Sequence, residues 1–311
     1  MINFRYHVVS LTAVFLALAI GLVVGTAALN GPLADSLSDQ VTALRSDNQR
    51  LRQEADHLKT DANAQEQFAA EAAPALLRNQ LTGKRVLVVT DSSGGDLAGG
   101  VQDMLALSGA TVTGRVDVQG KFNDPGNNDH LLDLVTQLLP PTVNGLPTNS
   151  DGVETASALL AAVLLDRAPS LSTESSRAVL HGFKDAGYLT WAGDTPPAPA
   201  QAVIVISGPP FVDRDATKKN QNVLTLVDQF DRAAPVVVVA EAPSGDGNVV
   251  GAVRGDPTLR KTISTVDNAS TTQGQVASVL AIVEQLAGGA GHYGIGAGNT
   301  SMLPKLNKPA Q

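Results

Sequence analysis

Four polar residues near the C-terminus could form a small site. Asp267 and Asn268 directly follow an apolar run, and His292 and Tyr293 lie in a glycine-rich stretch. A carboxylate, an amide, an imidazole and a phenol that converge could bind a ligand or transfer a proton. If both segments end at the same edge of a sheet, we expect this "rim site" there. The structural alternative is that Asn268 and Thr272 cap a turn and a helix, while Tyr293 packs against the core.

Other chemical patterns are missing from the sequence. The chain has no cysteine, no His-Glu-x-x-His zinc motif and no Gly-x-Ser-x-Gly nucleophile elbow. The loop Thr90–Asp96 follows the first expected strand but lacks the glycine patterns that bind phosphate, and Asp91 and Asp96 would repel an anion. We interpret its glycines as a tight turn and Asp96 as a helix N-cap. We interpret the tripeptide Arg254–Asp256 as the turn before Pro257. We therefore predict no enzyme activity and no resident cofactor.

Composition narrows the classes of partner. The chain has 311 residues and a net charge of −8, and no dense Lys/Arg patch occurs. Nucleic acids attract basic surfaces, so a nucleic-acid partner is not expected. Aromatic residues make up only 4% of the chain, and its core must therefore consist of small and branched aliphatic side chains, as in a buried parallel sheet.

The C-terminal two thirds of the chain predict an α/β domain. Short apolar runs alternate with helical stretches, which is typical of a mostly parallel, Rossmann-like sheet with helices on both faces. The domain spans residues 81–302, and residues 303–311 are expected to be a flexible tail. The expected strands are Val86–Thr90, Thr111–Val118, Val203–Ser207, Val236–Ala240, Val249–Val253 and Ile263–Val266. The expected helices are Leu97–Leu107, His130–Leu138, Thr155–Leu165, Thr173–Ala186, Gln221–Arg232 and Gln273–Leu286.

Residues 1–31 are predicted to be a membrane anchor. Val8–Leu29 carries no charge and is long enough to cross a bilayer. Arg5 precedes it and acidic residues follow it, so the N-terminus is expected in the cytoplasm and the remainder outside. The alternative is a signal peptide that is cleaved near Thr26–Ala28. Gly21 and Gly25 lie on a face of small residues that would let two such helices approach closely in lipid.

Residues 32–80 predict a coiled-coil stalk. A heptad repeat has d positions at Leu37, Leu44, Leu51 and Leu58, and a positions at Val41, Asn48, Ala55 and Ala62. A parallel pair would bring Asp47 to Arg52 and Glu54 to Lys59 of the second helix, and a buried Asn48 would set the register. We expect a parallel homodimer or a higher oligomer. The alternative is an amphipathic helix that lies on its own domain. Pro74 and Gly83 are expected to form the hinge that follows the stalk.

These stretches resemble the actinobacterial copper transporter MctB family. The resemblance covers nearly the whole chain and rests on Arg5–Leu18, the coiled coil, Ile263–Asn268, Gly274–Gln275 and Gly291–Gly294. It implies copper homeostasis, with export of copper across a mycobacterial-type envelope and a cell-envelope or outer-membrane location. It also implies a second function, beside a membrane-protein partner in cell separation at the septum. The resemblance defines no metal-binding residue that could be transferred to this sequence.

Three functional hypotheses follow from these observations. A copper transporter is implied by the resemblance, yet soft Cu(I) prefers thiolate or thioether ligands, and the chain offers only three methionines and five dispersed histidines. A non-enzymatic dimeric scaffold that acts with a membrane partner follows from the anchor and the stalk. An enzyme or nucleotide binder rests on fold class alone, which does not imply function.

Overall fold

The structure is a computed structural model that describes residues 4–30, 32–166, 171–241 and 247–305. Contacts divide the chain into two units that meet between Gln65 and Glu66. Most of the predicted tail, residues 306–311, lies outside the described residues. The two units are described separately below.

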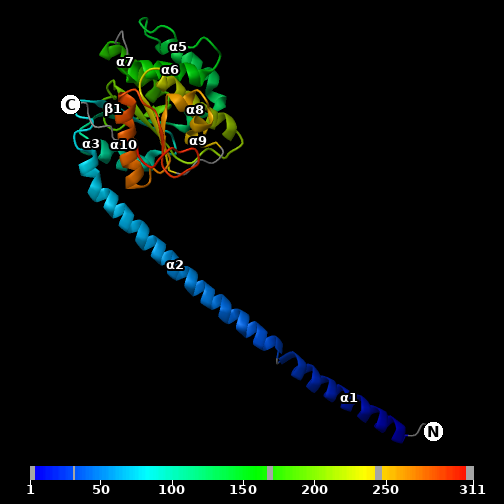
Figure 1. Cartoon of the computed structure of the whole chain (residues 1–311). Coiled ribbons are helices and arrows are strands. Elements are labelled where there is room, and N and C mark those ends of the chain that lie inside the picture. Colours follow the sequence, from blue (N-terminus) through cyan, green and yellow to red (C-terminus); the bar gives the residue numbers. More distant parts are fainter. Residues whose placement is uncertain (1–3, 31, 167–170, 242–246, 306–311) are drawn as a thin grey trace. The chain divides into compact units, whose positions relative to one another are not determined.

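The first unit consists of α1 (Phe4–Asn30) and the larger part of α2 (Pro32–Leu77) (Figure 1). The 24 residues of Phe4–Ala27 have a mean hydropathy of 2.6 and span about 36 Å, enough to cross a bilayer's hydrocarbon core. The hydroxyl of Thr12 donates to the carbonyl of Val8, 2.7 Å away, so this polar group is satisfied within the helix. The predicted N-terminal apolar helix is confirmed.

The first part of α2 exposes its leucines. Leu37, Leu44, Leu51 and Leu58 are between 56% and 68% exposed, and Val41 is 44% exposed. Asp47 and Glu54 lie 3.5 and 3.8 Å from Arg50 on the same helix. The described residues of this single chain therefore leave the heptad repeat, called the heptad seam below, uncovered. Pairing of two helices along the seam stays a prediction.

The second unit is built on a seven-stranded sheet with the order β3-β2-β1-β4-β5-β6-β7. All neighbouring strands are parallel except the β2–β3 pair, so the predicted mostly parallel α/β sheet is confirmed. The strands β2 and β3 lie on one side of β1, whereas β4 and the strands after it lie on the other side, so the strand order reverses between β1 and β4. The strands are β1 (Arg85–Thr90), β2 (Thr111–Val118), β3 (Leu189–Thr190), β4 (Ala202–Ser207), β5 (Val236–Ala240), β6 (Ser264–Val266) and β7 (His292–Tyr293).

Helices cover both faces of this sheet (Figure 1). The end of α2 packs with α3 and α10 over one face, where Val88 and Ile204 are buried. The helices α6, α7, α8 and α9 pack over the other face, on Val203 and Val238. The helices of this unit are α3 (Ala98–Leu107), α4 (Gly120–Asn123), α5 (Asn128–Leu138), α6 (Gly152–Leu164), α7 (Thr173–Asp185), α8 (Ala216–Asp231), α9 (Val249–Gly255) and α10 (Thr272–Leu286), with 3-10 turns η1 (Gly95–Leu97), η2 (Pro125–Asn127) and η3 (Leu259–Lys261).

Two local predictions were wrong. The run Val249–Val253 is helix α9 rather than a strand, because the side chain of Asn248 accepts from the backbone N–H of Val250 and Gly251 and starts a helix. Pro74 does not end α2 at the expected hinge: the helix continues to Leu77, three residues beyond it. The chain turns away only at Asn79 and Gly83, which have φ values of 63° and 75°.

Candidate functional site

The two C-terminal strands bring the rim-site residues to one edge of the sheet. In the parallel β6–β7 pair, Thr265 lies opposite His292 and Val266 lies opposite Tyr293. Asp267 and Asn268 follow β6 directly. All four rim-site residues are at least 96% buried, so they lie beneath the surface rather than in an open cleft.

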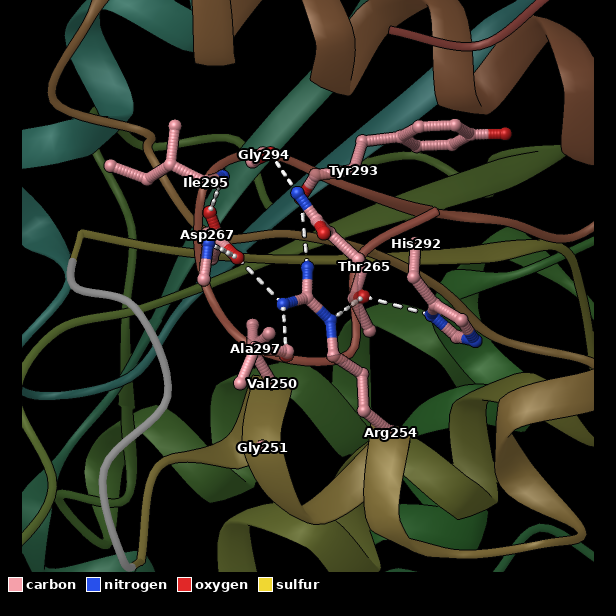
Figure 2. A network of polar contacts seen from close by, with 12 residues as sticks. Val250, Gly251, Arg254, Thr265, Asp267, His292, Tyr293, Gly294, Ile295 and Ala297 are labelled. Carbon is pink, nitrogen blue, oxygen red and sulfur yellow. Dashed lines mark hydrogen bonds and ion pairs between the residues drawn. The ribbon is translucent and has the colours of Figure 1, made fainter. Parts of the chain in front are cut away.

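Arg254 of α9 is the centre of a hydrogen-bond network around this edge (Figure 2). Its Nη1 donates to Asp267 Oδ2 over 2.6 Å and to the carbonyl of Ala297 over 3.0 Å. Nε donates to Thr265 Oγ1 over 2.9 Å, and Nη2 donates to the carbonyl of Tyr293 over 2.8 Å. The side chains of Arg254 and Asp267 are only 4% and 0% exposed. This is a buried ion pair in which four of the five guanidinium N–H groups are bonded.

Asp267 holds the glycine-rich segment that follows β7. Its two carboxylate oxygens accept from the backbone N–H of Ile295, at 2.7 Å, and of Gly296, at 2.8 Å. Gly294 has a φ of 116°, and a Cβ at this position would lie 2.0 Å from Asp267 Oδ1. Only glycine fits there, because any side chain would collide with the carboxylate. The pair Arg254–Asp267 therefore ties the C-terminal segment to the sheet.

His292 is held by both ring nitrogens. Nε2 lies 3.1 Å from the carbonyl of Arg260, so the proton must reside on Nε2. Nδ1 then accepts from the hydroxyl of Thr265, 2.9 Å away. Burial lowers the pKa of His292, and the charges of Arg254 and Arg260 lower it further, against a smaller opposing effect of the backbone bond. A neutral imidazole with both nitrogens engaged has no free position for a metal ion or a substrate.

We expect acid to destabilise the α/β unit through His292. Its pKa in the folded protein lies below the ordinary value of 6.5, so the unfolded chain binds the proton more tightly. The stability that this group contributes is complete above about pH 6.5 and is lost as the pH falls toward the folded pKa. Thermal unfolding between pH 7.5 and 5.5 should show a falling Tm, and a shallower fall in His292→Gln. In the control His130→Gln, which changes an exposed residue of α5, Tm should depend on pH as in the wild type. Equal slopes of Tm against pH in all three proteins would contradict a contribution of His292.

Asn268 and Tyr293 are engaged as well. The hydroxyl of Tyr293 donates to Glu284; burial, with a smaller contribution from this bond, raises the pKa of the phenol. The amide of Asn268 donates to the hydroxyl of Thr271 over 3.2 Å. Thr271 is the N-cap of α10, so the expectation that Thr272 caps this helix was wrong. Thr272 instead donates its hydroxyl and its backbone N–H to Glu66. Asn268 Oδ1 is buried and has no partner among the described residues.

The protein's own carboxylates occupy the places where an anionic ligand would bind. After β1, Asp91 accepts from the backbone N–H of Ser93 and Gly94, both at 2.8 Å, and from the hydroxyl of Ser207. Asp91 therefore caps this turn. The prediction that Asp96 is a helix N-cap was wrong, because Asp96 lies within η1 and Leu97 is at the N-cap of α3. Glu66 fills the equivalent place at the N-terminus of α10. Helix N-termini and backbone N–H groups attract phosphate, but here these N–H groups already donate to the carboxylates of Asp91 and Glu66.

The described residues contain no group of three or more His, Cys, Asp or Glu side chains that could hold a metal ion. The histidines other than His292 are exposed and dispersed, at His7, His57, His130 and His181. Met104 is partly buried in a hydrophobic cluster, and Met302 is 43% exposed. No copper site is assembled within the described part of this single chain.

Two residues of this region were missed in the sequence. Arg254 is the only charge in the apolar α9 segment, and a lone charge in such a run signals a buried pair. Glu66 carries no local signal, because its partner Thr272 lies 206 residues away in sequence.

Taken together, the chain is one apolar helix of membrane-spanning length joined to a mostly parallel α/β unit, with a polar centre that serves its own structure. The chain belongs to the MctB family: residues 1–304 match the family described as "Copper transport outer membrane protein, MctB". It is 31% identical over 319 residues to the copper transporter MctB of Mycobacterium leprae (strain TN), covering 97% of this chain and 99% of that protein. The Mycobacterium tuberculosis (strain H37Rv) protein of the same name is 28% identical over 323 residues, with the same coverage. The predicted resemblance is therefore confirmed.

Proposed function

We propose that this protein acts in copper transport and copper homeostasis at the cell envelope. The observation that carries the proposal is the match over residues 1–304 to a family described by copper transport. Relatives that carry the name copper transporter align over 97% of the chain, so anchor, stalk and α/β unit all have counterparts. The α/β unit is a doubly wound, Rossmann-like fold, and the strand order that reverses between β1 and β4 supports this assignment.

The chain crosses the cell membrane once, with its N-terminus in the cytoplasm and the α/β unit outside. The length and hydropathy of α1 support the anchor. Arg5 on one side of the apolar segment, with Asp35 and Asp39 on the other, supports this orientation. The family description supports association with the outer membrane.

A second function, a non-enzymatic dimeric scaffold, is favoured by two observations. The rim site and the turn after β1 are closed by their own side chains, and the described residues bring together no metal-binding cluster. The heptad seam is exposed, and exposed leucines in this repeat are typical of helices that pair. In this reading two copies present their α/β units to a membrane partner, in envelope maintenance or septal cell separation.

Cellular copper separates the two functions. A deletion strain grown with added copper should accumulate more copper than its parent, and the intact chain should restore the parental content. The α/β unit exported without residues 1–31 should fail to restore it, because the anchor places the chain in the assembly. Copper content is measured by mass spectrometry of washed cells. Unchanged copper in the deletion strain, together with a defect in cell separation, would favour the scaffold and rule against transport.

A further inference from the structure

An apolar groove runs along the end of α2 in the α/β unit. It has a volume of about 220 Å³. Its lining includes Phe68, Ala69, Ala72 and Leu76 of α2, Val276 of α10, and Met302 of the C-terminal segment. Phe68 is 73% exposed and Met302 is 43% exposed. Aromatic and thioether side chains grouped around an empty apolar groove indicate a surface that is covered by a partner.

The heptad repeat identifies which face of α2 the groove occupies. Counted onward from Ala62 at position a, the repeat puts Ala69 and Leu76 at a and Ala72 at d. All three line the groove. Most α2 residues that are fully buried or bonded in their own unit occupy other positions, although Leu76 at a is partly buried against the hydrophobic cluster. Glu66, at e, accepts hydrogen bonds from Thr272. Ala73, at e, and Leu77, at b, are fully buried. The a and d positions thus line the groove and keep part of their surface exposed.

The residue type at the g positions changes from acidic to aromatic where α2 reaches the groove. They are acidic through the stalk, at Asp47, Glu54 and Asp61, and the next one is Phe68. In a parallel pair a g side chain lies over the partner's core and next to the partner's e position. An acid there suits a solvated stalk with basic e residues. A phenylalanine there suits an apolar surface beside the partner's helix, and the groove provides such a surface.

We infer that the groove is the docking surface for a second copy of this chain, whose Phe68 inserts between Ala69, Ala72 and Val276. The two insertions are related by a twofold axis, so each copy provides one groove and one phenylalanine. Alanine at positions 69 and 72 lets the helices approach closely and leaves room for the ring. The docked α/β units form one rigid pair. This inference rests on the parallel pairing under the proposed function and extends it from the stalk to the α/β units.

Single cysteines in the full-length chain test this inference, because the natural chain has none. Three variants are compared in membranes with a short bismaleimide: Ala69→Cys in the groove, Ala62→Cys in the stalk, and Glu71→Cys on the exposed outer side of α2. We expect the first two to form a product of twice the chain mass at similar rates, and Glu71→Cys to stay single. Crosslinking at 62 without 69 would overturn docking while the paired stalk survives. Failure at both positions would overturn the pairing itself.

Removal of the aromatic ring provides the second readout. Phe68→Ala, added to Ala69→Cys, should slow crosslinking at position 69 by about tenfold, while the same change added to Ala62→Cys should leave that rate unchanged. Val212→Ala is the matched control, because Val212 is 91% exposed and lies outside the groove. Equal rates in Phe68→Ala and Val212→Ala would overturn the insertion of Phe68. A product at position 69 with a mass other than twice the chain would assign the groove to a different protein and overturn the inference.

Discussion

Replacement of Arg254 by alanine is expected to lower the free energy of unfolding of the α/β unit by about 3–5 kcal/mol, the usual cost of leaving one member of a buried ion pair unpaired. Asp267 is fully buried and would lose its counterion. The carbonyls of Tyr293 and Ala297 would lose their donor as well. The unfolding transition is measured by circular dichroism in urea on the full-length chain in detergent.

A surface pair provides the control. Arg232 lies 2.8 Å from Asp228, but its side chain is 64% exposed, and Arg232→Ala should cost no more than about 1 kcal/mol. Asp267→Asn in the Arg254→Ala background should recover part of the loss, because a neutral amide needs no counterion. If Arg254→Ala and Arg232→Ala unfold at the same urea concentration, the network does not hold the C-terminal segment.

The pair of changes Leu44→Asp and Leu51→Asp is expected to separate the two chains. Each buried leucine contributes about 1.5–3 kcal/mol, and four such side chains, two from each helix, would be lost from the paired stalk. That loss weakens association by about ten-thousand-fold or more. The new carboxylates would also face each other across the core. Light scattering of the full-length chain in detergent at micromolar concentration should then give a single chain of 32.0 kDa.

A matched variant adds the same charge away from the heptad seam. Gln49→Asp with Gln53→Asp changes positions b and f of the same turns, which face solvent in a paired stalk. It should keep the mass of two chains. If both double variants behave alike, either paired or single, the heptad seam is not the contact between copies.

Strand positions in the α/β unit could be predicted because apolar runs such as Val203–Ser207 and Val236–Ala240 are buried on both faces. Residues on the two faces belong to two different hydrophobic clusters, so no alternation appears in the sequence. The same reasoning failed at Val249–Val253, where a short run with three valines cannot be distinguished from a strand by composition. The cap at Asn248 decided the outcome there.

Part of the site could also be predicted. Asp267 follows β6 and His292 begins β7, so both lie at the expected edge of the sheet, although the strand His292–Tyr293 itself was not predicted. The contribution of Arg254 could not be predicted, since it comes from a helix packed across this edge and depends on tertiary structure. Likewise, nothing local relates Glu66 to Thr272, which lies 206 residues away in sequence.

These contacts change the interpretation of the rim site. Its residue types suit ligand binding, but each is bonded to another part of the same chain, apart from one oxygen of Asn268. A polar centre that is bonded almost throughout gives rigidity rather than chemistry. In this family member, exposed apolar surface suited to a partner lies on α2.

The most direct measurement is crosslinking of two full-length variants in intact cells, Leu44→Cys and Leu58→Cys, by mild oxidation with iodine. A parallel pair brings each of these residues opposite its own copy, so both variants should run at twice the mass of the chain. An antiparallel pair can bring only one level of the helix opposite itself. A product from one variant alone, or single chains from both, would contradict the paired, parallel assembly.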